Sequence, residues 1–328
     1  MRYIYCVAGE PRNHSLGSIG LRGAEVSTTS FRDICVLSSH LPDPDAIRPE
    51  DAVTHEKVVL RAMEEGSVVP VGFGLFARNE SDIEGIMRQG FIPFRETIER
   101  LRGAVQADVR VSWNNRFLAD VLKEKDVKLS YERLKEAPNN TTLKVELGRR
   151  IKESLTAEEK KLIPGVLNSL NALAMGYKEK RIENDDMIFN TSFLVKISEE
   201  GAFLSKIDEL EDAYEGFLRF RCVIPLPLYD FVNLKVKKSS FEALSEAKRI
   251  LGLDDPFSLS DVEIVFNKLV RLSHPDENTS PRADHEFRAL KSARDLLAEY
   301  CENYPCNTDK PFVDDRLIVC LSGRRTTS

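Results

Sequence analysis

Apolar residues alternate with polar ones, or run together, in several short stretches of the first third of the chain. Such runs, rich in β-branched and aromatic residues, favour strands, and they lie at residues 2–8, 24–31, 34–39 and 106–113. The three residues Phe31-Arg32-Asp33 leave room only for a tight link between the second and third of these strands.

Two amphipathic helices are predicted between these strands. The first starts near Glu50, where apolar residues begin to recur at helical spacing, and stops at Gly66, and the second spans about residues 81–101. Between them, residues 67–77 form a short apolar run with an internal proline and glycine, which predicts a buried or edge strand with a distortion. Residues 1–115 are therefore expected to form an α+β domain, with helices on one face of a mainly antiparallel sheet.

A charged helical pattern follows from residue 114 to about residue 177, with a break at Pro138-Asn139-Asn140. This pattern is typical of a solvated helical pair. A strand at 186–197, a helix at 199–214 and a strand at 216–236 come next. Residues 116–236 are therefore expected to combine a helical segment with a second small α+β domain.

The last part of the chain is predicted to be helical, except for one loop and one tail strand. Apolar stripes before and after residues 274–283 predict two helices that pack as an antiparallel pair, with a shorter helix at 241–251 bracing them. Ser258 or Ser260 is the expected cap of the first stripe, each with an acidic residue three positions later. Residues 241–303 would then be an all-α domain, and the tail 304–328 would hold a short strand at 316–322.

The composition limits the classes of function. The chain has 328 residues, 42% of them apolar and 30% charged, with a formal net charge of −6, which predicts a globular protein of two or three domains. A mildly acidic chain without a dense Lys/Arg cluster favours neither nucleic acid nor an anionic membrane surface as a partner. No apolar run is long enough for a membrane span, and the start of the chain lacks the pattern of a signal peptide, so we expect a cytoplasmic protein.

Candidate chemistry is sparse. The six cysteines are scattered without a C-x-x-C pair, which favours reduced thiols over zinc ligands. No nucleophile–base constellation, cofactor motif or metal cluster stands out, so we expect no catalytic residues, no cofactor and no metal. An enzyme is the least favoured class of function.

One stretch resembles a known family. The sequence "THEKVVLRAMEEGSVVPVGFGLFA" (residues 54–77) is similar to the signature of the gas vesicle accessory proteins GvpF and GvpL, in which a His-Glu pair opens a helix and a strand of the form V-x-P-x-[RK]-F-G-x-x-F follows. Gly72 stands where the family usually has a basic residue. The matching positions are His55, Glu56, Pro70, Phe73, Gly74 and Phe76.

A second, separate stretch resembles the same family. The sequence "VIPLPLYDFV" (residues 223–232) is similar to the family's G-P-W-P-P-Y-x-F-V, with matches at Pro225, Pro227, Tyr229, Phe231 and Val232. The resemblance covers most of residues 1–236. It implies two α+β domains, the first of them ferredoxin-like, and a non-enzymatic role in gas vesicle assembly through binding of the small hydrophobic shell protein GvpA.

His55 and Glu56 could be interpreted as a general base with an orienting carboxylate. Neighbouring residues point to different sides of a helix, however, and no Ser, Cys or second His accompanies them. A glutamate near a helix start is favoured by the helix dipole, and Thr54 is a plausible cap. We therefore expect structural roles here, and likewise for Pro70 to Phe76, where packing of a distorted strand accounts for the pattern.

The tripeptide His274-Pro275-Asp276 lies between the two C-terminal helices. As residues alone, it could be an acid–base pair, half a metal site or a docking tip. A metal site needs more ligands at suitable spacing, and His285 lies eleven residues further along. The layout resembles the J-domain of DnaJ-type cochaperones, which implies that His274, Pro275 and Asp276 dock on a DnaK-type chaperone and activate its ATPase.

The chain also departs from that second family. Where J-domains usually carry basic residues around the tripeptide, this chain has Leu272, Ser273 and Glu277. Two functions are therefore expected. The first is a gas vesicle assembly factor that binds GvpA, works with other Gvp proteins and recruits a chaperone. The second is a minor shell or interaction component whose J-like domain is only a docking module.

Overall fold

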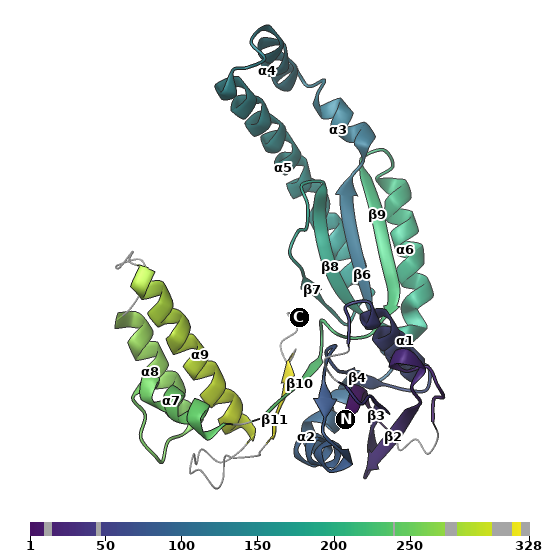
Figure 1. Ribbon diagram of the computed structural model, residues 1–328. Coiled ribbons are helices and arrows are strands. Elements are labelled where there is room, and N and C mark those ends of the chain that lie inside the picture. The colour runs from purple at the N-terminus through teal and green to yellow at the C-terminus, as the bar shows by residue number, and fades with distance from the viewer. Residues whose placement is uncertain (10–14, 44–46, 239, 273–280, 304–316, 323–328) are drawn as a thin grey trace. The chain divides into compact units, whose positions relative to one another are not determined.

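The structure is a computed structural model that describes residues 1–9, 15–43, 47–238, 240–272, 281–303 and 317–322 (Figure 1). Its contacts divide the chain into two compact units. The first unit comprises residues 1–58, 71–98 and 234–322, and the second mainly comprises residues 59–70 and 99–233. The predicted mixed α+β character is confirmed.

The N-terminal sheet has the strand order β2-β3-β1-β4, with β5 also pairing with β1. The buried strand β1 pairs antiparallel with β3, and β2 and β3 form a hairpin whose two-residue link has Arg32 at a left-handed φ of 54°. The predicted tight link is therefore confirmed. The strands are β1 (Arg2–Gly9), β2 (Val26–Phe31), β3 (Ile34–His40), β4 (Val68–Pro70) and β5 (Phe76–Ala77).

Helices α1 (Asp51–Met63) and α2 (Glu80–Arg100) belong to this part of the chain, and a short 3-10 helix, η1 (Leu21–Gly23), precedes β2. Asp51 begins α1, and its carboxylate accepts a hydrogen bond from the backbone N–H of Arg48 at 2.9 Å. The prediction that Thr54 caps α1 is thus wrong, because Thr54 lies inside the first turns of the helix.

The single distorted strand predicted at residues 67–77 is two short strands, β4 and β5, separated by a turn at residues 71–75. Gly74 in this turn has a φ of 96°, a backbone conformation that glycine adopts easily and other residues avoid. Pro70, at the end of β4, cannot donate a ladder hydrogen bond. The N–H of Val71 still donates to the carbonyl oxygen of Tyr5 at 3.1 Å, and the carbonyl oxygen of Leu75 accepts from the N–H of Ile4 at 3.0 Å, so the pairing with β1 is interrupted only at residues 72–74.

The middle sheet has the order β7-β8-β6-β9, with all neighbours antiparallel. Helices α5 and α6 pack on one of its faces around a core that includes Trp113, Val166, Phe193 and Phe203. The strands and helices are β6 (Ala104–Trp113), α3 (Asn115–Val121), α4 (Lys125–Glu136), α5 (Thr141–Asn171), β7 (Gly176–Glu179), β8 (Met187–Lys196), η3 (Ile197–Glu199), α6 (Glu200–Ala213) and β9 (Leu218–Leu226).

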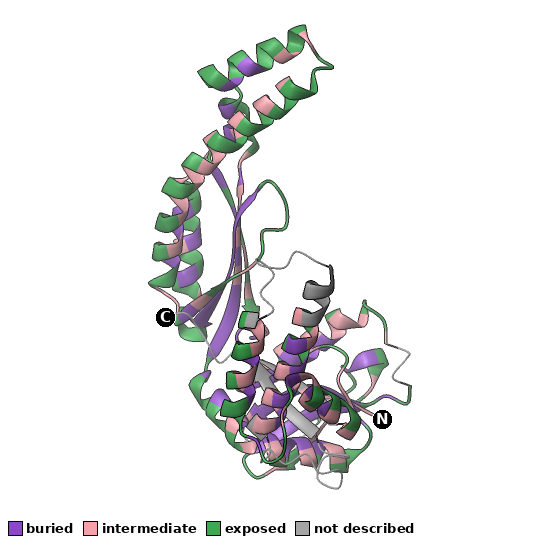
Figure 2. Cartoon of the chain, turned by 90° about the vertical axis from the view of Figure 1, so that its left-hand side faces the viewer, coloured by how far each residue is buried: buried purple, intermediate pink, exposed green. Residues whose placement is uncertain are grey.

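The predicted helical pair and its break are confirmed by α4 and α5. The Asn140 side chain ends the break by accepting a hydrogen bond from the N–H of Leu143 at 3.2 Å, which caps α5. Most residues of α4 and of the first half of α5 are exposed or only half-buried (Figure 2). The charged pattern therefore corresponds to a solvated pair, as expected.

Two expectations about this region are corrected. Strand β6, which the pattern assigned to the first domain, pairs with β8 and β9 in the middle sheet. The element order strand-helix-strand-strand-helix-strand, which is that of a ferredoxin-like unit, occurs in the middle unit, whereas the N-terminal unit places three strands before α1 among the described residues. The reason is the tight β2–β3 hairpin, which has no room for a helix.

The C-terminal helices are α7 (Phe241–Leu251), α8 (Leu259–Leu272) and α9 (Pro281–Asn303), and they share one apolar core that contains Leu244, Val262, Phe266, Leu297 and Tyr300. Ser258 is the cap of α8. Its hydroxyl accepts from the N–H of Asp261 at 3.2 Å, and the Asp261 carboxylate accepts from the N–H of Ser258 at 2.8 Å. The capping box predicted for this helix is therefore confirmed at Ser258.

The long strand predicted at 216–236 also divides, into β9 and β10 (Asn233–Lys238), with a turn at 227–232. The predicted tail strand is β11 (Leu317–Ser322), and it pairs with β10 from far along the chain. Among the described helices, none combines the length and apolar character that a membrane crossing requires.

Candidate functional site

The turn at residues 71–75 is held by a chain of hydrogen bonds through two buried side chains. His55, on α1, contacts the carbonyl oxygen of Val71 through Nε2 at 3.0 Å and the hydroxyl of Tyr3 through Nδ1 at 2.8 Å. The N–H of Gly74 donates to the same hydroxyl at 3.3 Å. His55 and Tyr3 therefore tie both ends of the turn to α1 and β1, and we call this set the turn clamp.

These contacts determine the protonation state of His55. A carbonyl oxygen only accepts, so Nε2 carries the hydrogen, and Nδ1 must accept from the O–H of Tyr3. Burial, partly offset by the hydrogen bond to Val71, lowers the pKa of His55 to about 4. Burial likewise raises the pKa of Tyr3. Both groups are neutral near pH 7, which favours a structural role over general base catalysis.

Aromatic rings surround the clamp. The ring of Tyr3 makes edge contacts with Tyr5, Phe73 and Phe76 at centroid distances of 5.0, 6.3 and 5.1 Å. Phe73 also contacts the His55 ring at 5.9 Å, yet 40% of Phe73 is exposed. The expectation that Phe73 is a buried packing residue is therefore wrong. The turn clamp presents this phenylalanine partly to the surface.

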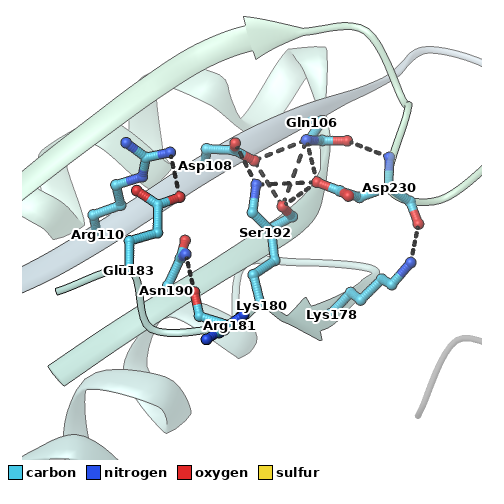
Figure 3. A network of polar contacts seen from close by, with 10 residues as sticks. All are labelled: Gln106, Asp108, Arg110, Lys178, Lys180, Arg181, Glu183, Asn190, Ser192 and Asp230. Carbon is cyan, nitrogen blue, oxygen red and sulfur yellow. Dashed lines mark hydrogen bonds and ion pairs between the residues drawn. The ribbon is translucent and has the colours of Figure 1, made fainter. Parts of the chain in front are cut away.

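A second set of polar contacts holds the turn at residues 227–232 against the middle sheet (Figure 3). The Gln106 side chain accepts from the N–H of Asp230 at 3.0 Å and donates to the Asp230 carboxylate at 2.9 Å. Ser192 lies 2.7 Å from the same carboxylate and 2.7 Å from that of Asp108. We call Gln106, Asp108, Lys180, Ser192 and Asp230 the sheet network.

Lys180 supplies the positive charge of the sheet network. Its Nζ lies 2.7 Å from an oxygen of Asp108 and 3.2 Å from one of Asp230. The pKa of Asp230 is lowered because the hydrogen bond from Ser192 and the ammonium of Lys180 outweigh the effect of burial. The pKa of Lys180 is raised because the two aspartates outweigh its burial. Paired charges that are fully hydrogen-bonded in this way are typical of structural networks.

The sequence-predicted residues divide between these two sets. His55, Phe73, Gly74 and Phe76 lie together in or beside the turn clamp, whereas Glu56 is only half-buried on α1. In the second segment Pro227 and Phe231 are buried, Tyr229 is half-buried and Pro225 is exposed on β9. Pro70, at the end of β4, is buried. The two family signatures thus mark the two turns that interrupt the predicted strands.

Sequence reasoning missed the polar partners of both turns, namely Tyr3, Gln106, Asp108, Lys180, Ser192 and Asp230. A signal existed for three of them, Gln106, Asp108 and Ser192. Gln106 and Asp108 alternate with apolar residues on β6, and Asn190 and Ser192 interrupt the otherwise apolar β8. Polar residues at alternate positions of a strand share one face. What the pattern lacks is any indication of which distant carboxylate that face meets.

The predicted docking tripeptide His274-Pro275-Asp276 lies outside the described residues. The helices before and after it, α8 and α9, are described, and they lie side by side (Figure 1). Arg294 of α9 lies 4.8 Å from the ring centroid of Phe266 on α8 and 3.8 Å from the carboxylate of Glu263. In the part of the chain that the structure describes, no three His, Cys, Asp or Glu side chains are grouped as metal ligands.

In both α+β units the signature turn is thus held by polar side chains from other elements. The family described as "Gas vesicle synthesis protein GvpL/GvpF" matches residues 1–233. This chain therefore belongs to the GvpL/GvpF family, and the match supports a role in gas vesicle formation. Residues 234–328, which include α7, α8 and α9, lie beyond the match.

Individual relatives agree with this assignment. Gas vesicle protein F2 of Halobacterium salinarum is 26% identical over 239 residues, covering 71% of this chain and 93% of the relative. Gas vesicle protein F of Nostoc sp. is 23% identical over 174 residues, covering 52% and 71%. The crystal structure of GvpF from Anabaena sp. has a TM-score of 0.60 at 21% identity, covering 70% of this chain and 96% of that one. GvpF from Microcystis aeruginosa has a TM-score of 0.58 with similar coverage, 70% and 98%.

Proposed function

We propose that this protein is a gas vesicle assembly factor that binds the shell protein GvpA with its family-type body and recruits a DnaK-type chaperone with its C-terminal helices. One observation carries the proposal. A family match that ends at residue 233 is followed by three helices with an apolar core of their own. Beyond the family match the chain thus continues with a helical module, α7 to α9, that has an apolar core of its own.

The helical module supports the J-domain-like part of the proposal by its layout. Two helices of 14 and 23 residues, α8 and α9, flank the segment with His274-Pro275-Asp276, and the shorter α7 joins their core. In the sequence the tripeptide lies between these two helices. Asp276 would then offer a carboxylate to a basic residue of the chaperone.

The proposed binding of GvpA rests on Phe73. Its ring is partly exposed in a turn that the turn clamp fixes. A fixed, partly exposed aromatic ring is a suitable anchor for an apolar partner because little conformational entropy is lost on binding. The shell protein exposes apolar surface before assembly, which is an aggregation hazard that an assembly factor would cover. We propose that both steps take place in the cytoplasm and at the gas vesicle, without catalysis by this protein.

The alternative is a minor shell or interaction component in which the helical module docks on a protein other than a chaperone. The weak basic character of α8 favours this alternative. Its only basic residues are Lys268 and Arg271, whereas a chaperone partner would be attracted by a basic face. The two functions differ in one respect: only an assembly factor is needed before the vesicle exists.

The test is a clean deletion of the gene, complemented with the full chain. We expect the deletion strain to make few or no buoyant vesicles, measured by flotation and by electron microscopy counts, and the full chain to restore them. Immobilised full-length protein should also retain newly made GvpA from a lysate. Normal vesicle numbers in the deletion strain, in a host without a second copy of the gene, would exclude the assembly role.

A further inference from the structure

The middle sheet has two chemically different faces. Alternate residues of β6, such as Val109 and Val111, point into the apolar core with α5 and α6. The residues that alternate with them, Gln106, Asp108 and Arg110, point to the other face, where the sheet network lies (Figure 3). The helices that share the apolar core with Val109 and Val111 are α3, α5 and α6, and none of them contributes a residue to the sheet network.

An arginine row crosses the second face at its β9 edge. Arg110 on β6 lies directly opposite Arg221 on β9, and Ser112 lies opposite Arg219. Like charges in directly opposed positions of antiparallel strands destabilise the sheet. Arg110 has a partner, Glu183, at 3.3 Å, but within the described parts of the chain no ion pair involves Arg219 or Arg221, both of which are exposed. The arginine row is Arg110, Arg219 and Arg221.

Strand β9 is also an edge of the sheet, since β6 is its only partner in the strand order among described residues. Charged residues on an edge strand are explained in many proteins by the prevention of aggregation alone. A single lysine or arginine on β9 would be enough for that purpose, and it would not need to lie directly opposite Arg110 of β6. Val223, 43% exposed, continues the row beyond Arg221. Arg219 and Arg221, which form no ion pair within the described residues, therefore lie next to an apolar end of the row, as in a docking surface.

The opposite side of the same unit is acidic. Helix α6 buries Phe203, Ile207 and Leu210 against the sheet. On its exposed side lie Asp208, Glu211 and Asp212, and the exposed Glu215 follows just beyond the end of the helix. Asp208 and Asp212 are four residues apart in α6, and like charges at this spacing destabilise a helix. In the described residues none of these four side chains forms an ion pair. We call them the acidic ridge.

We propose that two copies of this chain associate head to tail, with the acidic ridge of one copy seated on the arginine row of the next. The two surfaces have opposite charge, and each contains like-charge neighbours whose repulsion the other would relieve. Because both belong to one unit and lie on opposite faces of its sheet, one copy can use both at once. Such a head-to-tail contact leaves one ridge and one row free at the ends of each assembly, so the products are chains of copies or rings, both larger than a dimer.

The test uses purified full-length protein and three double variants in sedimentation velocity at about 0.1 M salt, where charges more than about 10 Å apart are largely screened. The first variant, Arg219→Glu with Arg221→Glu, removes the arginine row. The second, Asp208→Lys with Asp212→Lys, removes the acidic ridge. The control, Lys57→Glu with Lys128→Glu, has the same change of charge as the first variant at exposed positions elsewhere.

We expect the mean mass of the wild type to rise with concentration beyond a dimer, and to fall to that of a monomer at about 1 M salt. Each of the first two variants alone should be monomeric, and the control should behave as the wild type does. An equimolar mixture of the two variants should associate again, because the intact ridge of the first variant meets the intact row of the second and the introduced lysines face the introduced glutamates. This mixture also shows that neither variant is merely unfolded.

Three results would overturn the proposal: a wild type that stays monomeric at every concentration, a control that loses association like the first variant, or a mixture that stays monomeric. None of them depends on GvpA or on a chaperone. Failure here would therefore leave the proposed assembly function untouched.

Discussion

At the scale of single residues, His55 makes the stability of the protein depend on pH. The folded state holds it neutral with a pKa of about 4, against 6.5 for an ordinary histidine. Between these values the unfolded chain binds a proton that the folded chain does not, so the free energy of unfolding rises with pH in this window. The contribution of His55 is complete above pH 6.5 and is lost as the pH falls towards 4.

We expect the loss to amount to about 3 kcal/mol, from about 1.4 kcal/mol for each pKa unit. Urea unfolding at a series of pH values should show this slope in the wild type and a much flatter one in His55→Gln. His40→Gln, which changes an exposed histidine at the end of β3, should keep the slope of the wild type. A His55→Gln variant with an unchanged slope would show that another group is responsible.

Phe73 is more exposed to solvent than the aromatic residues of the core. It is 40% exposed, whereas Phe94 of α2 is fully buried. Truncation of a buried phenylalanine costs about 3–5 kcal/mol, and a half-exposed one should cost roughly half of that. We therefore expect Phe73→Ala to fold with a moderately lowered Tm and to lose retention of GvpA, while Phe94→Ala loses stability more severely. If Phe73→Ala keeps full binding of GvpA, the anchor lies elsewhere.

At the scale of elements, two turns interrupt what the hydrophobic pattern presents as continuous strands. The turn at 71–75 is closed by the turn clamp, and the turn at 227–232 is closed by the sheet network. In both, the segment after the turn continues as a strand, β5 or β10. Polar side chains from other strands and helices thus decide where the chain changes direction.

The network predicts a specific loss of stability. In Asp230→Ala the side chains of Gln106 and Ser192 keep Asp108 as an acceptor but lose their hydrogen bonds to the Asp230 carboxylate, and a hydrogen bond to a charged group contributes about 1.5–3 kcal/mol. We expect a loss of that size in the free energy of unfolding. Asp120→Ala, which breaks an exposed ion pair with Lys123, should change it by less than about 0.5 kcal/mol. Equal effects of the two variants would mean that the network adds nothing to an ordinary surface pair.

At the scale of the whole molecule, the chain continues beyond its family-type body with the helices α7, α8 and α9. The body is matched by a gas vesicle family, and the helical module α7–α9 follows it. The network of the middle sheet and the core of the module are separate, since no residue belongs to both. Variants in the segment between α8 and α9 should therefore leave the body intact.

We expect His274→Gln and Asp276→Asn to leave helical content and Tm nearly unchanged, because neither residue belongs to the apolar stripes that predict the two helices. Each should abolish stimulation of the ATPase of a DnaK-type chaperone from the same host, and should lower vesicle yield most at low chaperone levels. Glu277→Gln in the same segment is the matched control and should retain stimulation. No stimulation by the wild type at low salt, with any such chaperone of the host, would leave only the docking-module function.

The sequence by itself was sufficient for the features that depend on local order. Helical spacing of apolar residues predicted α2, α6 and α7 within one or two residues of their ends, and Pro138 with Asn140 predicted the break before α5. The Ser258 capping box was likewise visible, because a cap and its partner lie three residues apart. The two family signatures pointed to the two turns without showing that they were turns.

Only the tertiary structure decided which strands share a sheet, which side chains are buried and which polar groups meet. β6 joined β8 and β9, β10 paired with β11, and Phe73 stayed partly exposed despite its apolar surroundings in the sequence. Asp230 found Gln106 at a separation of 124 residues. The physical reason is that periodicity records which face of an element is apolar, whereas partners across a sheet are selected by long-range packing, which leaves no repeating pattern along the chain.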